Sequence, residues 1–97
     1  MLFALICKDK PGALQIRLDT RPAHLAWLDE LNAAKKIAFA GPFLNGEGKP
    51  DGSLVVVEAA DRAEAEALAS RDPYAGAGLF ESVEVRAWNW VVNKPST

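Results

Sequence analysis

The chain has 97 residues, of which 49% are hydrophobic and 25% are charged, and its formal net charge is −2. This composition is too apolar and too weakly charged for a disordered chain, and its acidic balance argues against nucleic acid as a partner. A chain of this length forms one domain, residues 1–97, with a modest core. No apolar run approaches the roughly 20 residues needed to cross a bilayer. The apolar start at residues 2–7 has neither a charged segment before it nor a cleavage site after it, so we expect a cytoplasmic protein with no membrane partner.

The first predicted strand covers residues 2–7, which are apolar at every position, as is typical of a strand covered on both faces. Apolar residues at helical spacing then follow at Leu25, Leu28 and Leu31. This spacing predicts a helix over 21–35, with Thr20 as its N-cap and Pro22 in its first turn. In this helix His24 lies near the start and points toward the buried side.

The second half of the chain predicts two strands, a helix and a final strand. The strands cover 37–43 and 53–59 and are joined by the turn-rich stretch "LNGEGKPDG". An alanine-rich helix over 62–71 follows Asp61, which forms a capping pattern with Glu64. The last strand covers 81–92. The order β-α-β-β-α-β is that of the ferredoxin-like split βαβ, an α+β fold whose four-stranded antiparallel sheet carries both helices on one face.

Strand residues on both faces of this sheet are apolar, notably in 2–7 and 54–57. Two helices cover only one face, and a chain of this size has no third layer for the other. We therefore expect a homodimer that packs sheet against sheet, with further assembly left open. The alternative is that the second face is simply an apolar surface of a monomer.

His24 is the only histidine in the chain, and Asp72 lies where the second helix ends. In the split βαβ arrangement both helices lie on one face, so Asp72 can approach His24. A carboxylate that accepts a hydrogen bond from one imidazole nitrogen leaves the other nitrogen free to take a proton, as in a general base. The alternative is that His24 is a packed residue and that Asp72, before Pro73, only marks the end of the helix.

Cysteine usage limits other chemistry. Cys7 is the only cysteine, which excludes an internal disulfide, and no Cys/His cluster has metal-ligand spacing. Neither Cys7 nor Ser53 has a sequence sign of activation, which disfavours covalent catalysis. We expect neither a metal nor another cofactor.

Four segments, in order, resemble the YciI-like (YCII-related) family of small bacterial proteins: "RPAHLAWLDEL", "AGPF", "GSLVVVEA" and "DPYAGAGLFESVEVRAWN". The resemblance spans nearly the whole chain. It implies a ferredoxin-like fold that dimerises through its sheets into an α/β barrel. It also implies an active-site histidine and aspartate, which correspond to His24 and Asp72.

The same resemblance implies further site residues. Arg17 and Arg21 resemble arginines that precede the family's histidine and would hold an anionic substrate group. Ser53 would supply a hydroxyl, and Tyr74 would line the pocket; the alternatives are exposed charges, a turn residue and a packing residue. Many members carry a longer insertion between the second and third strands than "LNGEGKPDG", so a loop that would enclose the substrate is reduced here.

The first functional hypothesis is an enzyme without a cofactor that acts on a small anionic or cyclic organic molecule. His24 would be the general acid/base and Asp72 would orient it, in a lyase, dehydrochlorinase-like or isomerase reaction. The second is a non-catalytic binding or accessory module that uses the same pocket. A third treats Trp88 and Trp90 as a ring-stacking surface, although two such tryptophans are more often core or interface residues.

Overall fold

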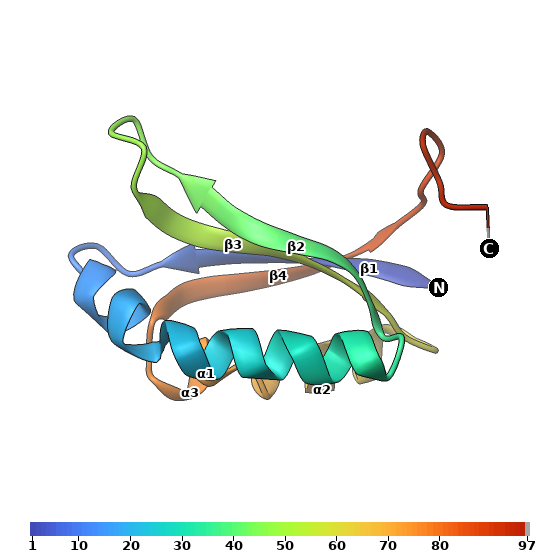
Figure 1. Cartoon of the computed structure of the whole chain (residues 1–97), viewed down its shortest axis with the longest axis horizontal. Coiled ribbons are helices and arrows are strands. Elements are labelled where there is room, and N and C mark those ends of the chain that lie inside the picture. The colour runs from blue at the N-terminus through green and yellow to red at the C-terminus, as the bar shows by residue number, and fades with distance from the viewer. Residues whose placement is uncertain (97) are drawn as a thin grey trace.

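A computed structural model describes residues 1–96 of the chain. The elements are β1 (Leu2–Asp9), α1 (Leu14–Ala33), β2 (Ile37–Leu44), β3 (Pro50–Glu58), α2 (Arg62–Ser70), α3 (Pro73–Gly76) and β4 (Phe80–Trp88). The four strands form one sheet in the order β2-β3-β1-β4, and every neighbouring pair is antiparallel. All three helices lie on one face of this sheet, and the other face carries no helix (Figure 1). The predicted ferredoxin-like α+β fold is confirmed.

The core lies between the sheet and the helices. On β1, Phe3 and Leu5 alternate with residues of the open face, and they pair with Val57 and Val55 of β3 in register. Trp27 of α1 and other apolar side chains of α1 and α2 pack onto this row; they are Leu31, Ala65 and Leu68. Burying a large apolar side chain contributes about 1.5–3 kcal/mol, so this layer supplies most of the force that holds the helices on the sheet.

Helix α1 begins at Leu14, seven residues before the start that apolar spacing predicts, so the predicted N-cap at Thr20 is wrong. The buried face of α1 includes the polar residues Arg17 and His24 as well as Trp27 and Leu31. A count of apolar residues alone therefore misses the first two turns. Pro22 lies inside the helix and not in its first turn. It has no N–H to offer the carbonyl four residues earlier.

The predicted second helix and its cap are confirmed. Asp61 is the N-cap of α2, and its side chain accepts a hydrogen bond of 2.9 Å from the backbone N–H of Glu64. The helix ends at Ser70, and a second, single-turn helix, α3, follows it. Spacing gives no signal for α3, because a helix of four residues is too short to show a period.

The last strand ends at Trp88, four residues earlier than predicted. Its partner β1 begins at Leu2, which pairs with Trp88, so residues beyond this point have no strand to pair with. Trp90 is therefore outside the sheet, and its indole N–H donates to the carbonyl of Val92 at 2.7 Å. The third strand is longer than predicted and begins at Pro50.

The open face of the sheet is largely apolar. Cross-strand register places Ile6 with Leu54, and Leu2 with Trp88, on this face. At one end the rings of Phe39, Trp88 and Trp90 contact one another, with centroids 5.0–5.7 Å apart. Phe39, Trp88 and the neighbouring Phe43 nonetheless remain 36–42% exposed. The chain covers only part of this face with its own side chains.

No helix within residues 1–96 combines the length and hydropathy that a membrane crossing requires.

Candidate functional site

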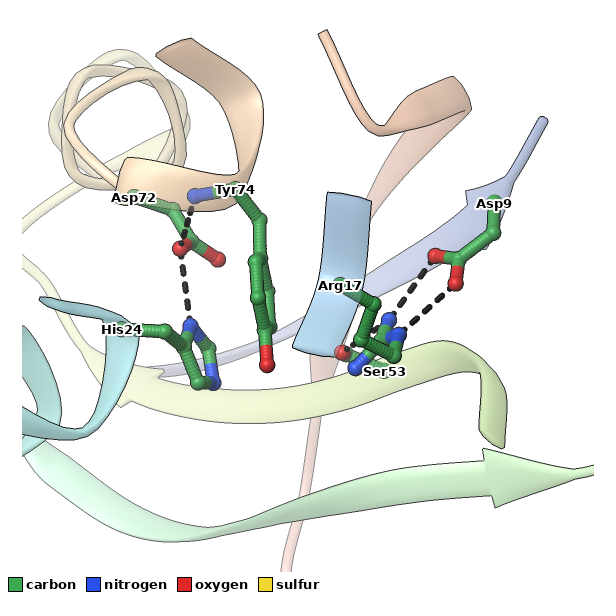
Figure 2. A network of polar contacts seen from close by, with 6 residues as sticks. All are labelled: Asp9, Arg17, His24, Ser53, Asp72 and Tyr74. Carbon is green, nitrogen blue, oxygen red and sulfur yellow. Dashed lines mark hydrogen bonds and ion pairs between the residues drawn. The ribbon is translucent and has the colours of Figure 1, made fainter. Parts of the chain in front are cut away.

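The aspartate at the end of α2 serves as the cap of α3. Asp72 has an extended backbone (φ −61°, ψ 124°), as expected for an N-cap before Pro73. Its Oδ1 accepts a hydrogen bond of 2.9 Å from the backbone N–H of Tyr74. The same oxygen lies 2.8 Å from Nδ1 of His24 on α1 (Figure 2). One buried carboxylate oxygen therefore fixes both the start of α3 and the imidazole of the facing helix.

His24 is held on several sides. Its ring stacks on that of Tyr74, with centroids 4.0 Å apart and planes 18° apart, and its centroid lies 5.9 Å from that of Trp27. Bonded to an ionised Asp72, Nδ1 carries the hydrogen, so Nε2 has a free lone pair. Figure 2 shows Nε2 pointing away from Asp72, on the same side as the Tyr74 hydroxyl.

The predicted position of His24 within its helix is wrong, although its orientation is right. Because α1 begins at Leu14, His24 lies in the interior of the helix and not near its start.

A second buried pair lies on the other side of Tyr74. The Nε and Nη2 atoms of Arg17 donate to the two carboxylate oxygens of Asp9 at 2.7 and 2.8 Å, and Nη2 also donates to the hydroxyl of Ser53 at 2.9 Å. Burial alone would lower the pKa of Arg17, but the hydrogen bonds and charge of Asp9 outweigh it and raise that pKa. Arg17 is therefore a permanent cation, held in a two-pronged pair.

Tyr74 lies between the two pairs. The guanidinium carbon of Arg17 is 4.5 Å from the centroid of its ring, and the imidazole of His24 stacks against the opposite face (Figure 2). Burial raises the pKa of the phenol, and the positive charge of Arg17 offsets this only in part. The hydroxyl is therefore protonated at neutral pH and has a hydrogen that it can donate.

A cavity of about 380 Å³ opens beside these groups, between α1 and the β2–β3 hairpin. Its polar lining comes from Arg17, Arg21, His24, Ser53 and Tyr74. Most of the remaining wall is apolar: Leu18, Leu25, Leu28, Ala40, Pro42, Leu44, Pro50 and Val55. The volume is within the range of pockets that hold small organic ligands.

The structure brings the residues proposed from the sequence to one place, with different burial. Arg17, His24, Ser53 and Tyr74 are buried side chains that line the cavity, whereas Arg21 is exposed. Asp72 is not part of the lining and lies behind His24. Ser53 is engaged by Arg17, so its hydroxyl is already in the polar network.

Sequence reasoning missed Asp9. It is the last residue of β1 and is only 8% exposed, although the end of a strand is where a solvated charge is expected. Arg17 follows it by eight residues, across a turn in which Gly12 has φ +72°. The sequence holds no local signal for this pair, because the burial of Arg17 and its contact with Asp9 arise only in the folded chain.

Two further observations concern possible metal ligands and the thiol of Cys7. Among residues 1–96, no group of three or more His, Cys, Asp or Glu side chains is placed to hold a metal ion. Cys7 is buried, and burial, reinforced by the charge of Asp72, raises the pKa of its thiol to about 12. A thiol with this pKa is not a nucleophile at neutral pH.

Comparison with known proteins decides the family. The model of the YCII-related domain matches residues 1–89. The chain belongs to this family. Protein YciI of Escherichia coli O6:H1 is 37% identical, with 94% of this chain and 99% of the relative covered. An uncharacterized protein of Haemophilus influenzae, another relative of this YCII-related chain, is 31% identical over the same shares.

Solved structures also resemble the chain. The 5-chloro-2-hydroxyhydroquinone dehydrochlorinase (TftG) of Burkholderia phenoliruptrix AC1100, in complex with 2,5-dihydroxybenzoquinone, is 38% identical to the YCII-related chain. The match has a TM-score of 0.84 and covers 92% of this chain and 94% of that one. An antibiotic biosynthesis monooxygenase at 15% identity and a TM-score of 0.51 shares the fold alone.

Proposed function

We propose that this YCII-related protein is an enzyme that performs general acid/base chemistry on a small, oxygen-substituted cyclic molecule. The observation that carries the proposal is the buried pair of His24 and Asp72, in which Nδ1 lies 2.8 Å from Oδ1. The other ring nitrogen of His24, Nε2, faces a cavity of about 380 Å³. A packing histidine has no need of an orienting carboxylate and an open pocket together. His24 is the catalytic residue in this proposal, and Asp72 positions it.

The chemistry follows from the hydrogen bonds. The Nδ1–H of His24 donates to Asp72, which fixes the tautomer and the ring orientation. Nε2 then accepts a proton from the substrate, and the Asp72 carboxylate stabilises the imidazolium that forms. Such a proton abstraction begins an elimination or an isomerisation, which suits a lyase, dehydrochlorinase-like or isomerase reaction.

The lining of the cavity favours a small anionic ring. Its wall is mostly apolar, and the exposed Arg21 places a positive charge beside it. A flat ring with an anionic oxygen would satisfy both features, the ring against the leucines and the oxygen toward the basic side. The relative TftG, a dehydrochlorinase of a hydroxylated ring crystallised with a dihydroxybenzoquinone, supports this class of substrate.

The experiment is chloride release from 5-chloro-2-hydroxyhydroquinone by the wild-type chain and by His24→Gln. Glutamine keeps a donor for Asp72 but has no base, so we expect a loss of about 10²–10⁴ in kcat. Circular dichroism and the oligomeric mass check that the variant is folded. Full activity of His24→Gln would rule out the mechanism. A compound that binds both chains equally and is turned over by neither would favour the non-catalytic binding module.

We also propose that a second copy of the chain covers the open face of the sheet. The exposed rings of Phe39, Phe43 and Trp88 on that face, and the aliphatic rows beside them, support this partner. Two such faces packed together would form the α/β barrel expected from the family resemblance. Light scattering is expected to give twice the mass of one chain, or a higher even multiple, and a monomer at micromolar concentration would contradict the proposal.

A further inference from the structure

A three-layer stack stands between the two buried pairs. The Arg17 guanidinium, the Tyr74 ring and the His24 imidazole lie face to face, at 4.5 Å and 4.0 Å (Figure 2). Tyr74 is only 2% exposed, yet it lines the cavity, and its hydroxyl lies at the same end of the stack as Nε2 of His24. The phenol and the imidazole thus line the same cavity.

The placement of the phenol relative to the base is fixed by one atom. Oδ1 of Asp72 accepts from the backbone N–H of Tyr74 and also binds Nδ1 of His24. The positions of His24 and Tyr74 therefore both depend on the Asp72 carboxylate, and a movement of this carboxylate would displace both rings. A ring that served only to fill space would not need its backbone held by the carboxylate that orients the imidazole.

The charges around the phenol suit a donor to an anionic oxygen. The Tyr74 hydroxyl keeps its proton at neutral pH, because burial raises the pKa of the phenol. Arg17, a permanent cation, lies against the ring, and the exposed Arg21 lies beside the same cavity. Asp9 occupies two nitrogens of Arg17, which holds the cation against the ring.

We infer that the Tyr74 hydroxyl donates a hydrogen bond to the substrate oxygen that becomes negative, while His24 takes the proton; this rests on the proposed function. In the diketo form of a chlorinated trihydroxybenzene, a proton on the carbon next to a carbonyl goes to Nε2, the C–H electron pair forms a carbon–carbon double bond, and the carbonyl π pair moves onto the oxygen. The oxygen pair then re-forms the carbonyl, the carbon–carbon pair shifts to form a double bond with the neighbouring carbon, and chloride leaves that carbon with the C–Cl pair, which gives the hydroxyquinone. The ligand class is a planar ring with an anionic oxygen, such as a hydroxyquinone.

The test compares Tyr74→Phe with the wild-type chain. Phenylalanine keeps the stacked ring and removes only the hydroxyl. We expect kcat for chloride release from 5-chloro-2-hydroxyhydroquinone to fall about a hundredfold or more. We also expect binding of 2,5-dihydroxybenzoquinone to weaken about tenfold, since a hydrogen bond to a charged oxygen is lost. Ser82→Ala, which removes an exposed hydroxyl away from the cavity, is the matched control and should change neither value.

The outcomes separate this inference from the proposed function. A loss in either measurement supports the inference. Unchanged values in Tyr74→Phe overturn it, even if His24→Gln is inactive and the proposed function stands. If the wild-type chain binds the quinone without turnover and Tyr74→Phe binds it more weakly, the oxygen site stands and the proposed function fails. A wild-type chain that does not bind the quinone overturns the inference, because the ligand class is part of it.

Discussion

Asp9–Arg17 and His24–Asp72 are two buried acid–base pairs on opposite sides of the Tyr74 ring, and they differ in what they leave free. Asp9 and Arg17 meet through two hydrogen bonds, and Ser53 takes a third. His24 and Asp72 meet through one, and Nε2 faces the cavity (Figure 2). The first pair is satisfied by the protein itself, as a structural pair must be. The second leaves Nε2 of His24 open to the cavity.

The largest expected loss of stability comes from breaking the Asp9–Arg17 pair. Asp9→Asn leaves the cation of Arg17 buried without a counter-charge, and removing one partner of a buried pair costs about 3–5 kcal/mol. Urea denaturation measures this loss in the free energy of unfolding. Glu66→Gln breaks the exposed pair with Arg62 and is the matched control, with a change of at most about 0.5 kcal/mol. Equal losses in the two variants would show that the buried pair has no structural role.

A smaller effect on stability is expected from Cys7, whose neutral thiol lies near both pairs. The pKa of Cys7 rises from its ordinary 9.0 to about 12, mainly through burial and then through the charge of Asp72. Between these values the unfolded chain loses the thiol proton and the folded chain keeps it, so stability falls as pH rises from 9 toward 12. From pH 8 to 10, we expect the wild-type chain to lose about 1.4 kcal/mol more than Cys7→Ala. Parallel pH profiles for the two chains would contradict a raised pKa.

The smallest stability effect is expected at the second pair. Asp72→Asn keeps an oxygen that can accept from the Tyr74 N–H, and asparagine is as good an N-cap as aspartate, so unfolding should change by less than about 1 kcal/mol. Activity should nonetheless fall by about 10²–10⁴, because the neutral amide cannot stabilise the imidazolium that forms when His24 takes the proton. Thermal unfolding and chloride release measure the two quantities. A variant that lost stability and kept its activity would reverse the contrast between the pairs.

The two pairs also differ in how far the sequence could predict them. Apolar periodicity and turn residues give the order of elements and the sheet. Because that order places both helices on one face, it also predicts that Asp72, just after α2, meets His24 on α1. The start of α1 could not be found in this way, because its first buried residue is Arg17, which a hydrophobic pattern counts as surface.

The polar network was also out of reach for pattern reasoning. Asp9 pairs with Arg17 through tertiary contact between a strand end and a helix, and no local spacing encodes that contact. The end of β4 depends on where its partner β1 begins, which is again a property of the assembled sheet. The expected order of elements brought Asp72 to His24 and the family resemblance supplied the other site residues, whereas the pairing of Asp9 with Arg17 depends on a tertiary contact.

The shared oxygen of Asp72 makes the proposed catalytic group compact in the sequence. Three consecutive residues, Asp72, Pro73 and Tyr74, carry the orienting acid, the turn-forming ring and the phenol, and a single histidine on a facing helix completes the set. Protein engineers who wish to transplant this pair onto another split βαβ scaffold would graft one tripeptide and one histidine, and would also need Arg17 against the Tyr74 ring and the cavity beside it.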